Sequence, residues 1–294
     1  MIALSSSVFS QPRTLVQAFV CVLLAGALAT PVAAQNGGGG DLNALKQAYR
    51  EGMQAAKQND HETAYPRLEE AYSLAQEAEQ SNAARQILSV LQQIPKQWGN
   101  AALKNENYPE ALMHFEKGTE HAPQDAYMLY GQGLALVNLD STDTAMSKMS
   151  QAIDVGQANG DTRTANLATE RIRQEYIARA SQALSAQNPT TSKAEEALTA
   201  LDQMREYVDP SAKSLFYRSL AYDIQGDYEQ AIETAERGLE MHQGSRSDAA
   251  RYYFVIAESQ MRMGNTEQAC QTFQDATYGE YRARAEHYLE NQCE

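Results

Sequence analysis

The chain has 294 residues, of which 43% are hydrophobic and 8% aromatic, so it has enough apolar side chain to fold and extensive disorder is excluded. Its 24 Lys and Arg residues stand against 38 Asp and Glu residues, which gives a formal net charge of −14. A nucleic-acid duplex or an anionic membrane surface repels such a chain, so we expect no general binding to nucleic acid.

The first 34 residues have the layout of a secretory signal peptide. An apolar run over 14–29 is short for a membrane span, and the small residues Val32 and Ala34 precede a cleavage position after Ala34. We therefore expect a signal peptide over 1–34 and a Gly-rich flexible leader over 35–42, with the mature protein periplasmic or secreted. An uncleaved membrane anchor is the alternative.

Beyond the leader, the sequence has helical periodicity and a recurring frame of small residues. Ala231 follows a small residue, Ser219, by twelve positions and precedes Gly238 by seven. The anchor alanines of this frame are Ala64, Ala111, Ala145, Ala197, Ala231 and Ala269. Glycine inside a helix costs about 1 kcal/mol relative to alanine. Its presence at fixed positions predicts that neighbouring helices approach closely there.

This frame resembles the tetratricopeptide repeat family, whose unit is a helix-turn-helix of about 34 residues. The best unit has Trp98 and Gly99, then Ala111, Phe115 and Pro123, at the positions of the family pattern. The resemblance extends over roughly residues 43–292. It implies an all-α fold, a right-handed α-solenoid of about six helix-turn-helix units with a C-terminal capping helix.

The resemblance divides residues 43–278 into six units and leaves 279–294 as the capping helix. The units are expected near 43–76, 81–123, 125–157, 162–209, 212–243 and 247–278. Two units begin with unusually long helices, which we place at 82–105, with a bend near Pro95, and at 162–187.

No catalytic motif is complete in the sequence. His61 and Glu62 resemble part of a zinc-protease helix, but Tyr65 stands where the second histidine is required. Gly131 and Gly133 resemble the start of a phosphate-binding loop, yet the third glycine and the preceding strand are missing. We therefore expect no enzyme activity, no cofactor and no metal site.

Cleavage after Ala34 removes Cys21 and leaves Cys270 and Cys293. The resemblance to exported repeat proteins with a similar cysteine pair favours a disulfide between them. Such a bridge would stabilise the fold by about 3 kcal/mol in the chain-entropy model. The alternative is two small buried residues that do not bond.

The resemblance also implies a binding surface, because the first helices of the units line the inner face of the family's solenoid. The candidate groove residues carried over by position are Lys96, Asn100, Lys104, Tyr127, Tyr130, Phe216, Arg251 and Phe254, with Asn138, Lys213, Asp223 and Arg262 at related positions. Lys96 and Asn100 match a lysine-asparagine pair that grips a terminal carboxylate in one subgroup. Gly131 replaces that subgroup's next asparagine, so this clamp is incomplete.

Aromatic and arginine side chains are efficient anchors for peptides, although the same residues can instead fill the space between successive helices. The sequence thus predicts an exported scaffold that binds a protein or peptide in the bacterial cell envelope, as an adaptor or assembly factor. The alternatives are a self-assembling structural envelope protein and a binder of a small molecule or glycan through the groove.

Overall fold

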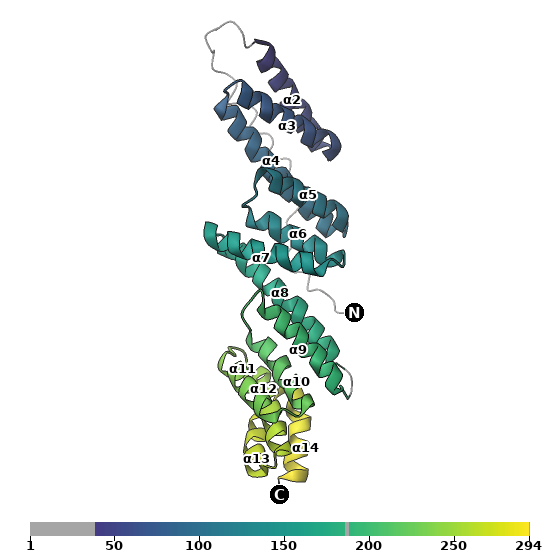
Figure 1. Ribbon diagram of the computed structural model, residues 1–294, viewed down its shortest axis with the longest axis vertical. Coiled ribbons are helices and arrows are strands. Elements are labelled where there is room, and N and C mark those ends of the chain that lie inside the picture. Colours follow the sequence, from purple (N-terminus) through teal and green to yellow (C-terminus); the bar gives the residue numbers. More distant parts are fainter. Residues whose placement is uncertain (1–38, 186–187, 294) are drawn as a thin grey trace. The chain divides into compact units, whose positions relative to one another are not determined.

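The computed structural model describes residues 39–185 and 188–293, which form 13 α-helices, one short 3-10 helix and no strand (Figure 1). The all-α repeat architecture is confirmed for this part of the chain. None of its helices is long and apolar enough to cross a membrane. The predicted signal peptide lies outside the described residues.

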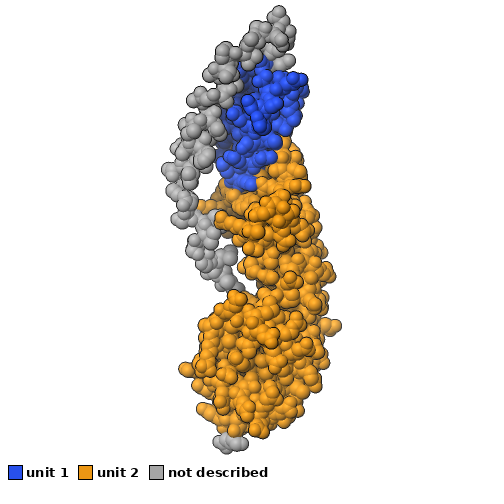
Figure 2. Space-filling view, turned by 90° about the vertical axis from the view of Figure 1, so that its left-hand side faces the viewer, with its two compact units in different colours: residues 1–97 blue, residues 98–294 orange. Residues whose placement is uncertain are grey.

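The chain divides into two compact units, residues 1–97 and 98–294 (Figure 2). The described part of the first unit contains α2 (Gly39–Lys57), α3 (His61–Glu77) and the larger part of α4 (Ser81–Lys104). Helix α2 begins at Gly39, inside the range assigned above to the leader.

The second unit starts within α4 and continues as alternating helices, which we call first helices (α4, α6, α8, α10 and α12) and second helices (α5, α7, α9, α11 and α13). The bounds are α5 (Tyr108–His121), α6 (Ala126–Asn138), α7 (Thr142–Asn159), α8 (Thr162–Ala183), α9 (Thr191–Arg205), α10 (Ala212–Gln225), α11 (Tyr228–Glu240), α12 (Arg246–Arg262) and α13 (Thr266–Asp275). The capping segment is a 3-10 helix, η1 (Gly279–Tyr281), followed by α14 (Arg282–Gln292).

The two long helices expected from the sequence are α4 and α8. Helix α4 runs through Pro95, and α8 ends at Ala183, earlier than the predicted limit of 187. Within the second unit each helix packs on the next, and the first helices α6, α8, α10 and α12 also contact one another in series. They therefore form a continuous layer on one side of the second helices.

Short polar residues begin the helices as the sequence requires. The Asp125 carboxylate accepts hydrogen bonds from the backbone N–H groups of Tyr127 and Met128 at the start of α6. Ser211 and Ser245 form capping boxes at the starts of α10 and α12. Each cap satisfies N–H groups that have no partner inside the helix.

The small-residue frame is a packing surface in which large side chains fill the space that glycines leave. The fully buried ring of Phe115 on α5 lies against Gly99 of α4 and Gly131 of α6. A Cβ atom would lie 2.7 Å from that ring at position 99 and 2.6 Å at position 131. Further along the chain, Met149 packs against Gly133 and Tyr252 against Gly238 in the same way.

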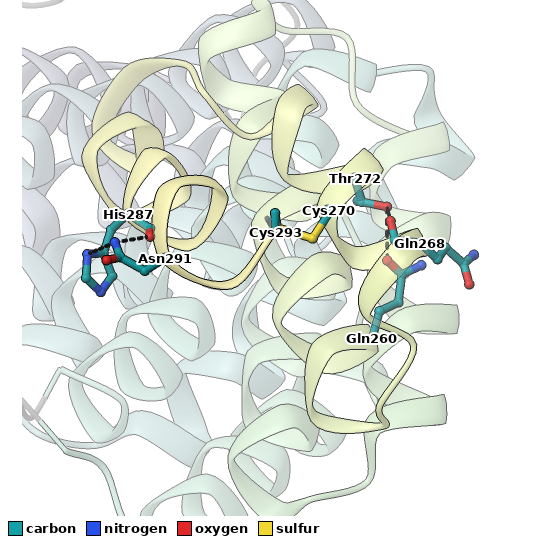
Figure 3. The surroundings of a disulfide bond; sticks show 7 residues. All are labelled: Gln260, Gln268, Cys270, Thr272, His287, Asn291 and Cys293. Atoms are coloured by element: carbon teal, nitrogen blue, oxygen red, sulfur yellow. Dashed lines mark hydrogen bonds between the residues drawn. A yellow bond between two sulfur atoms is a disulfide. The ribbon is translucent and has the colours of Figure 1, made fainter.

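The capping segment is attached to the last helix pair covalently and by aromatic contacts. Cys270 of α13 is bonded to Cys293, which follows α14, and their Cα atoms are 5.6 Å apart (Figure 3). The disulfide favoured by the family resemblance is thus present in the structure. Tyr288 of α14 stacks on Phe273 of α13, with ring centroids 4.5 Å apart. Of the side chains of α14, only Ala285 is buried.

We predict that Gly131→Ala lowers the free energy of unfolding by about 1–2 kcal/mol, because the overlap with the Phe115 ring exceeds the gain in helix propensity. Urea unfolding followed by circular dichroism measures this loss. The matched comparison is Gly131→Ala in a Phe115→Leu background. There the smaller side chain should reduce the loss in the free energy of unfolding that the alanine causes. An equal loss in both backgrounds would contradict the packing explanation.

We predict that reduction of the Cys270–Cys293 bridge, which joins residues 23 positions apart, lowers the free energy of unfolding by about 3 kcal/mol. Urea unfolding with and without a reducing agent measures the difference. The Cys270→Ser/Cys293→Ser variant should match the reduced protein and should not respond to the reducing agent. Identical curves for the oxidised and reduced wild type would show that the bridge does not restrain the cap.

Candidate functional site

The structure separates the candidate groove residues into three groups. Lys96 is half-buried on α4 in the first unit. The candidates on α4 and α6 of the second unit, Asn100, Lys104, Tyr127, Tyr130 and Asn138, remain half-buried or exposed. The residues on α10 and α12, apart from the exposed Lys213, belong to the packing beneath the capping segment.

The open surface is built around two tyrosines on α6. The hydroxyl of Tyr127 donates a 2.9 Å hydrogen bond to Oδ1 of Asn100 on α4. The rings of Tyr127 and Tyr130 pack edge to face, with centroids 6.4 Å apart. Asn100, Tyr127 and Tyr130 are all half-buried. The Asn100 oxygen is therefore already occupied, and it positions an aromatic pair.

The sequence of α6 determines how these tyrosines are presented. The helix contains no charged residue, and Tyr130, Leu134 and Val137 are partly buried against the core of the second unit. Their spacing places them on one face of the helix. Asn138 ends the helix and is exposed. One edge of this apolar stripe is thus packed, and the other remains accessible.

Arg171 of α8 is a charged neighbour of Tyr130. Burial raises the pKa of the Tyr130 hydroxyl, and the Arg171 guanidinium opposes that increase, so the phenol is neutral at physiological pH. The Arg171 side chain is 27% exposed, and its Nη2 atom pairs with Oε1 of Glu175 at 2.5 Å. Its Nε donor has no acceptor among the described residues. Sequence reasoning missed Arg171 because the insertion between α8 and α9 shifts this helix out of the repeat frame.

We define the α4–α6–α8 surface as six half-buried or exposed residues that these helices carry in the second unit. They are Asn100, Lys104, Tyr127, Tyr130, Asn138 and Arg171. Lys104 is exposed and lies four residues after Asn100, hence on the same face of α4. The surface therefore contains aromatic rings, amides and two cations, which are groups that can contact a ligand.

The prediction that Phe216 and Phe254 line an open groove is wrong. Phe216 is 5% exposed and Phe254 is 1% exposed. The ring of Tyr281, from the capping segment, lies 6.5 Å from the Phe216 ring and 5.2 Å from that of Phe254. The Arg284 guanidinium lies 4.1 Å above the Phe254 ring. The capping segment thus occupies the side of these aromatics that was expected to be open.

The charged candidates near the C-terminus are also used for packing. Asp223 of α10 is 3% exposed, accepts from Ser259 Oγ at 2.8 Å and pairs with Arg262 Nη1 at 2.9 Å. Burial raises the pKa of Asp223, and the Arg262 charge and the Ser259 hydrogen bond partly oppose this increase. Arg262 also pairs with Glu258 at 3.2 Å, and Glu258 accepts from the hydroxyl of Tyr288. This network connects α10, α12 and the cap.

Arg251 contacts neighbouring residues, whereas Lys213 is exposed to solvent. The Arg251 guanidinium lies 5.5 Å from the Phe216 ring, and its Nε donates to the backbone oxygen of Asp248. Lys213 is exposed at the start of α10. Neither residue extends the aromatic surface of α6.

Comparison with solved structures finds proteins of low sequence identity to this chain. The MamA protein is 15% identical over 69% of this chain and 96% of its own, with a TM-score of 0.37. A thermophilic tetratricopeptide repeat protein of Thermus thermophilus is 19% identical over 68% of this chain and 99% of its own, with a TM-score of 0.30. A tetratricopeptide repeat protein of Parabacteroides merdae is 14% identical over 84% of this chain and 98% of its own, with a TM-score of 0.31. Such low scores carry no argument about the arrangement of the helix pairs.

A search of curated proteins finds no match. The tetratricopeptide repeat model, in contrast, matches residues 96–162, 191–246 and 218–286, which together cover more than half of the chain. The matched ranges contain the Phe115 packing and the helices α5 to α7 and α9 to α13, while α8 lies between the first two ranges. The chain therefore belongs to the tetratricopeptide repeat family.

Proposed function

We propose that this protein is a scaffold that holds a protein or peptide partner on the α4–α6–α8 surface, as an adaptor or assembly factor in a bacterial cell envelope. Membership of the tetratricopeptide repeat family supports binding, because such repeats typically serve protein–protein interaction through the extended surfaces that stacked helix pairs create. Export is supported by the layout of residues 1–34 and by a disulfide, a bond that persists in oxidising compartments.

The observation that carries the proposal is the fixed and half-buried pair of Tyr127 and Tyr130. Asn100 holds the first ring through a hydrogen bond, and the core of the second unit holds the second. Tyrosine is a frequent anchor at interfaces because it offers apolar area and a polar group with few rotatable bonds. A surface that is already ordered loses little conformational entropy when a partner binds.

Site-specific crosslinking tests which face of the molecule meets the partner. A photoreactive amino acid replaces either Asn138, at the end of α6, or Ser147, on α7 of the same helix pair; both positions are exposed. Irradiation in extracts of the source organism should give an adduct from position 138 and none from position 147. Adducts from position 147 only would place the partner on the second helices and contradict the proposal.

We predict that Tyr130→Ala lowers the affinity for the captured partner about tenfold or more, which is the loss expected when an aromatic anchor is truncated. Tyr130→Phe keeps the ring and should lose much less. The control is Tyr108→Ala, which removes a half-buried tyrosine from the second helix α5. Titration of each variant with the partner measures the three affinities, and circular dichroism verifies that each is folded. Equal losses in Tyr130→Ala and Tyr108→Ala would remove the tyrosine pair from the interface.

A further inference from the structure

The capping segment reaches further than the last helix pair. Helix α14 packs on α13, and η1 packs on α12. Tyr281, the last residue of η1, is half-buried and packs against two separate core clusters, one around Phe216 and Tyr252 and one around Phe254 and Phe273. A segment that only closed the last pair would cover α12 and α13. The contact with Phe216 of α10 is therefore additional, and it places one ring between the aromatics of two first helices.

Arg284 makes the second contact of the capping segment with α12. It follows Tyr281 by three residues, so the two side chains lie on the same face. The Arg284 guanidinium lies 4.1 Å above the Phe254 ring, and its Nη2 atom is 3.7 Å from Oε2 of Glu258. Glu258 itself is 8% exposed. The cation is thus held between an aromatic face and a buried carboxylate.

The Arg284 charge also completes the balance of the buried network. Asp223 and Glu258 carry two negative charges, and within α10 and α12 they are paired with Arg262 alone. Arg284 brings the second positive charge from the capping segment. The first helices α10 and α12 therefore present an aromatic position and an adjoining position for a cation, which we call the cap-covered site, formed by Phe216, Phe254 and Glu258.

Both ends of the capping segment are fixed to the same helix. Its first residues follow α13 directly, and Cys293 after α14 is bonded to Cys270 of α13 (Figure 3). With both ends tied, the segment remains over α12. Cys270 and Cys293 are half-buried, so a reductant has partial access to the bond. Reduction frees one of the two ends.

We propose that the cap-covered site is a second binding site, for a helical peptide that carries an aromatic residue and, three positions later, an arginine. The capping segment is its tethered occupant while the disulfide is intact. A dithiol reductant opens the site: the Cys270–Cys293 bond breaks, and the dithiol supplies two electrons and two protons and becomes a disulfide itself. The partner peptide then replaces Tyr281 and Arg284. This site is separate from the α4–α6–α8 surface and goes beyond the function proposed above.

Fluorescence anisotropy of a labelled peptide with the sequence of residues 278–292 tests the proposal. The receiving protein is the full mature chain with Tyr281→Ala/Arg284→Ala, whose own capping segment no longer fills the site. Further substitution with Cys270→Ser/Cys293→Ser should raise the affinity for the peptide about tenfold or more, because the oxidised protein still holds the segment over the site. The control peptide carries Tyr281→Ala/Arg284→Ala and should bind the bridge-free protein about tenfold more weakly.

The outcomes decide each part of the proposal. Equal affinities of the two peptides for the bridge-free protein, or no binding of either, would overturn the aromatic–arginine site. Equal affinities of the oxidised and bridge-free proteins for the labelled peptide would overturn the control of access by the bridge. Circular dichroism verifies that each variant is folded, and none of these results changes the proposal for the α4–α6–α8 surface.

Hydrogen exchange on the wild-type protein needs no variant to fold. Reduction with a dithiol should speed the exchange of the α14 amides about tenfold or more, and an excess of the peptide should speed it further by displacing the segment. Unchanged exchange in α14 after reduction would contradict the proposal. Formation of a dimer on reduction that the peptide does not dissociate would assign the site to the capping segment of a second copy and overturn the assignment to a separate partner.

Discussion

The close approach of consecutive helices around large side chains is the constraint on which the structure depends. Phe115 fits between α4 and α6 because positions 99 and 131 have no Cβ atom. A helix pair of this kind does not bury its apolar face by itself, so each pair requires the next one. The same arrangement recurs at Met149 and Tyr252, which explains why the small residues return at fixed spacing.

This stacking also decides where a ligand can bind. The large side chains are directed into the spaces between helices, and the outer edges of the first helices remain as a stiff layer. On α6 that edge carries Tyr127 and Tyr130 with no charge beside them on the helix. After α13 the capping segment covers the aromatic side chains of α10 and α12. The disulfide and the network of Asp223, Arg262 and Glu258 then hold that segment in place.

The repeat frame was predictable from the sequence because each helix pair needs small residues at the positions where it packs closely against its neighbour. The frame of Ala111 and Phe115 has a local spacing, and the structure reproduces the helix pairs that it implies. The open surface was only partly predictable. Tyr130, Phe216 and Phe254 each precede an anchor alanine by fifteen positions, yet Tyr130 is half-buried and Phe254 is 1% exposed. Position within a unit does not specify which distant segment covers it, and here Tyr281 covers two of the three. Arg171 lay beyond prediction for a related reason, since the insertion before α9 breaks the frame.

Hydroxyl-radical footprinting of the protein with and without its bound partner tests the central claim most directly, because tyrosine rings react according to their exposure. The account predicts that binding slows the oxidation of Tyr127 and Tyr130 and leaves Tyr108 and Tyr228, on the second helices α5 and α11, unchanged. Protection of Tyr108 or Tyr228 without protection of the α6 pair would contradict it, and would move the binding surface to the second helices.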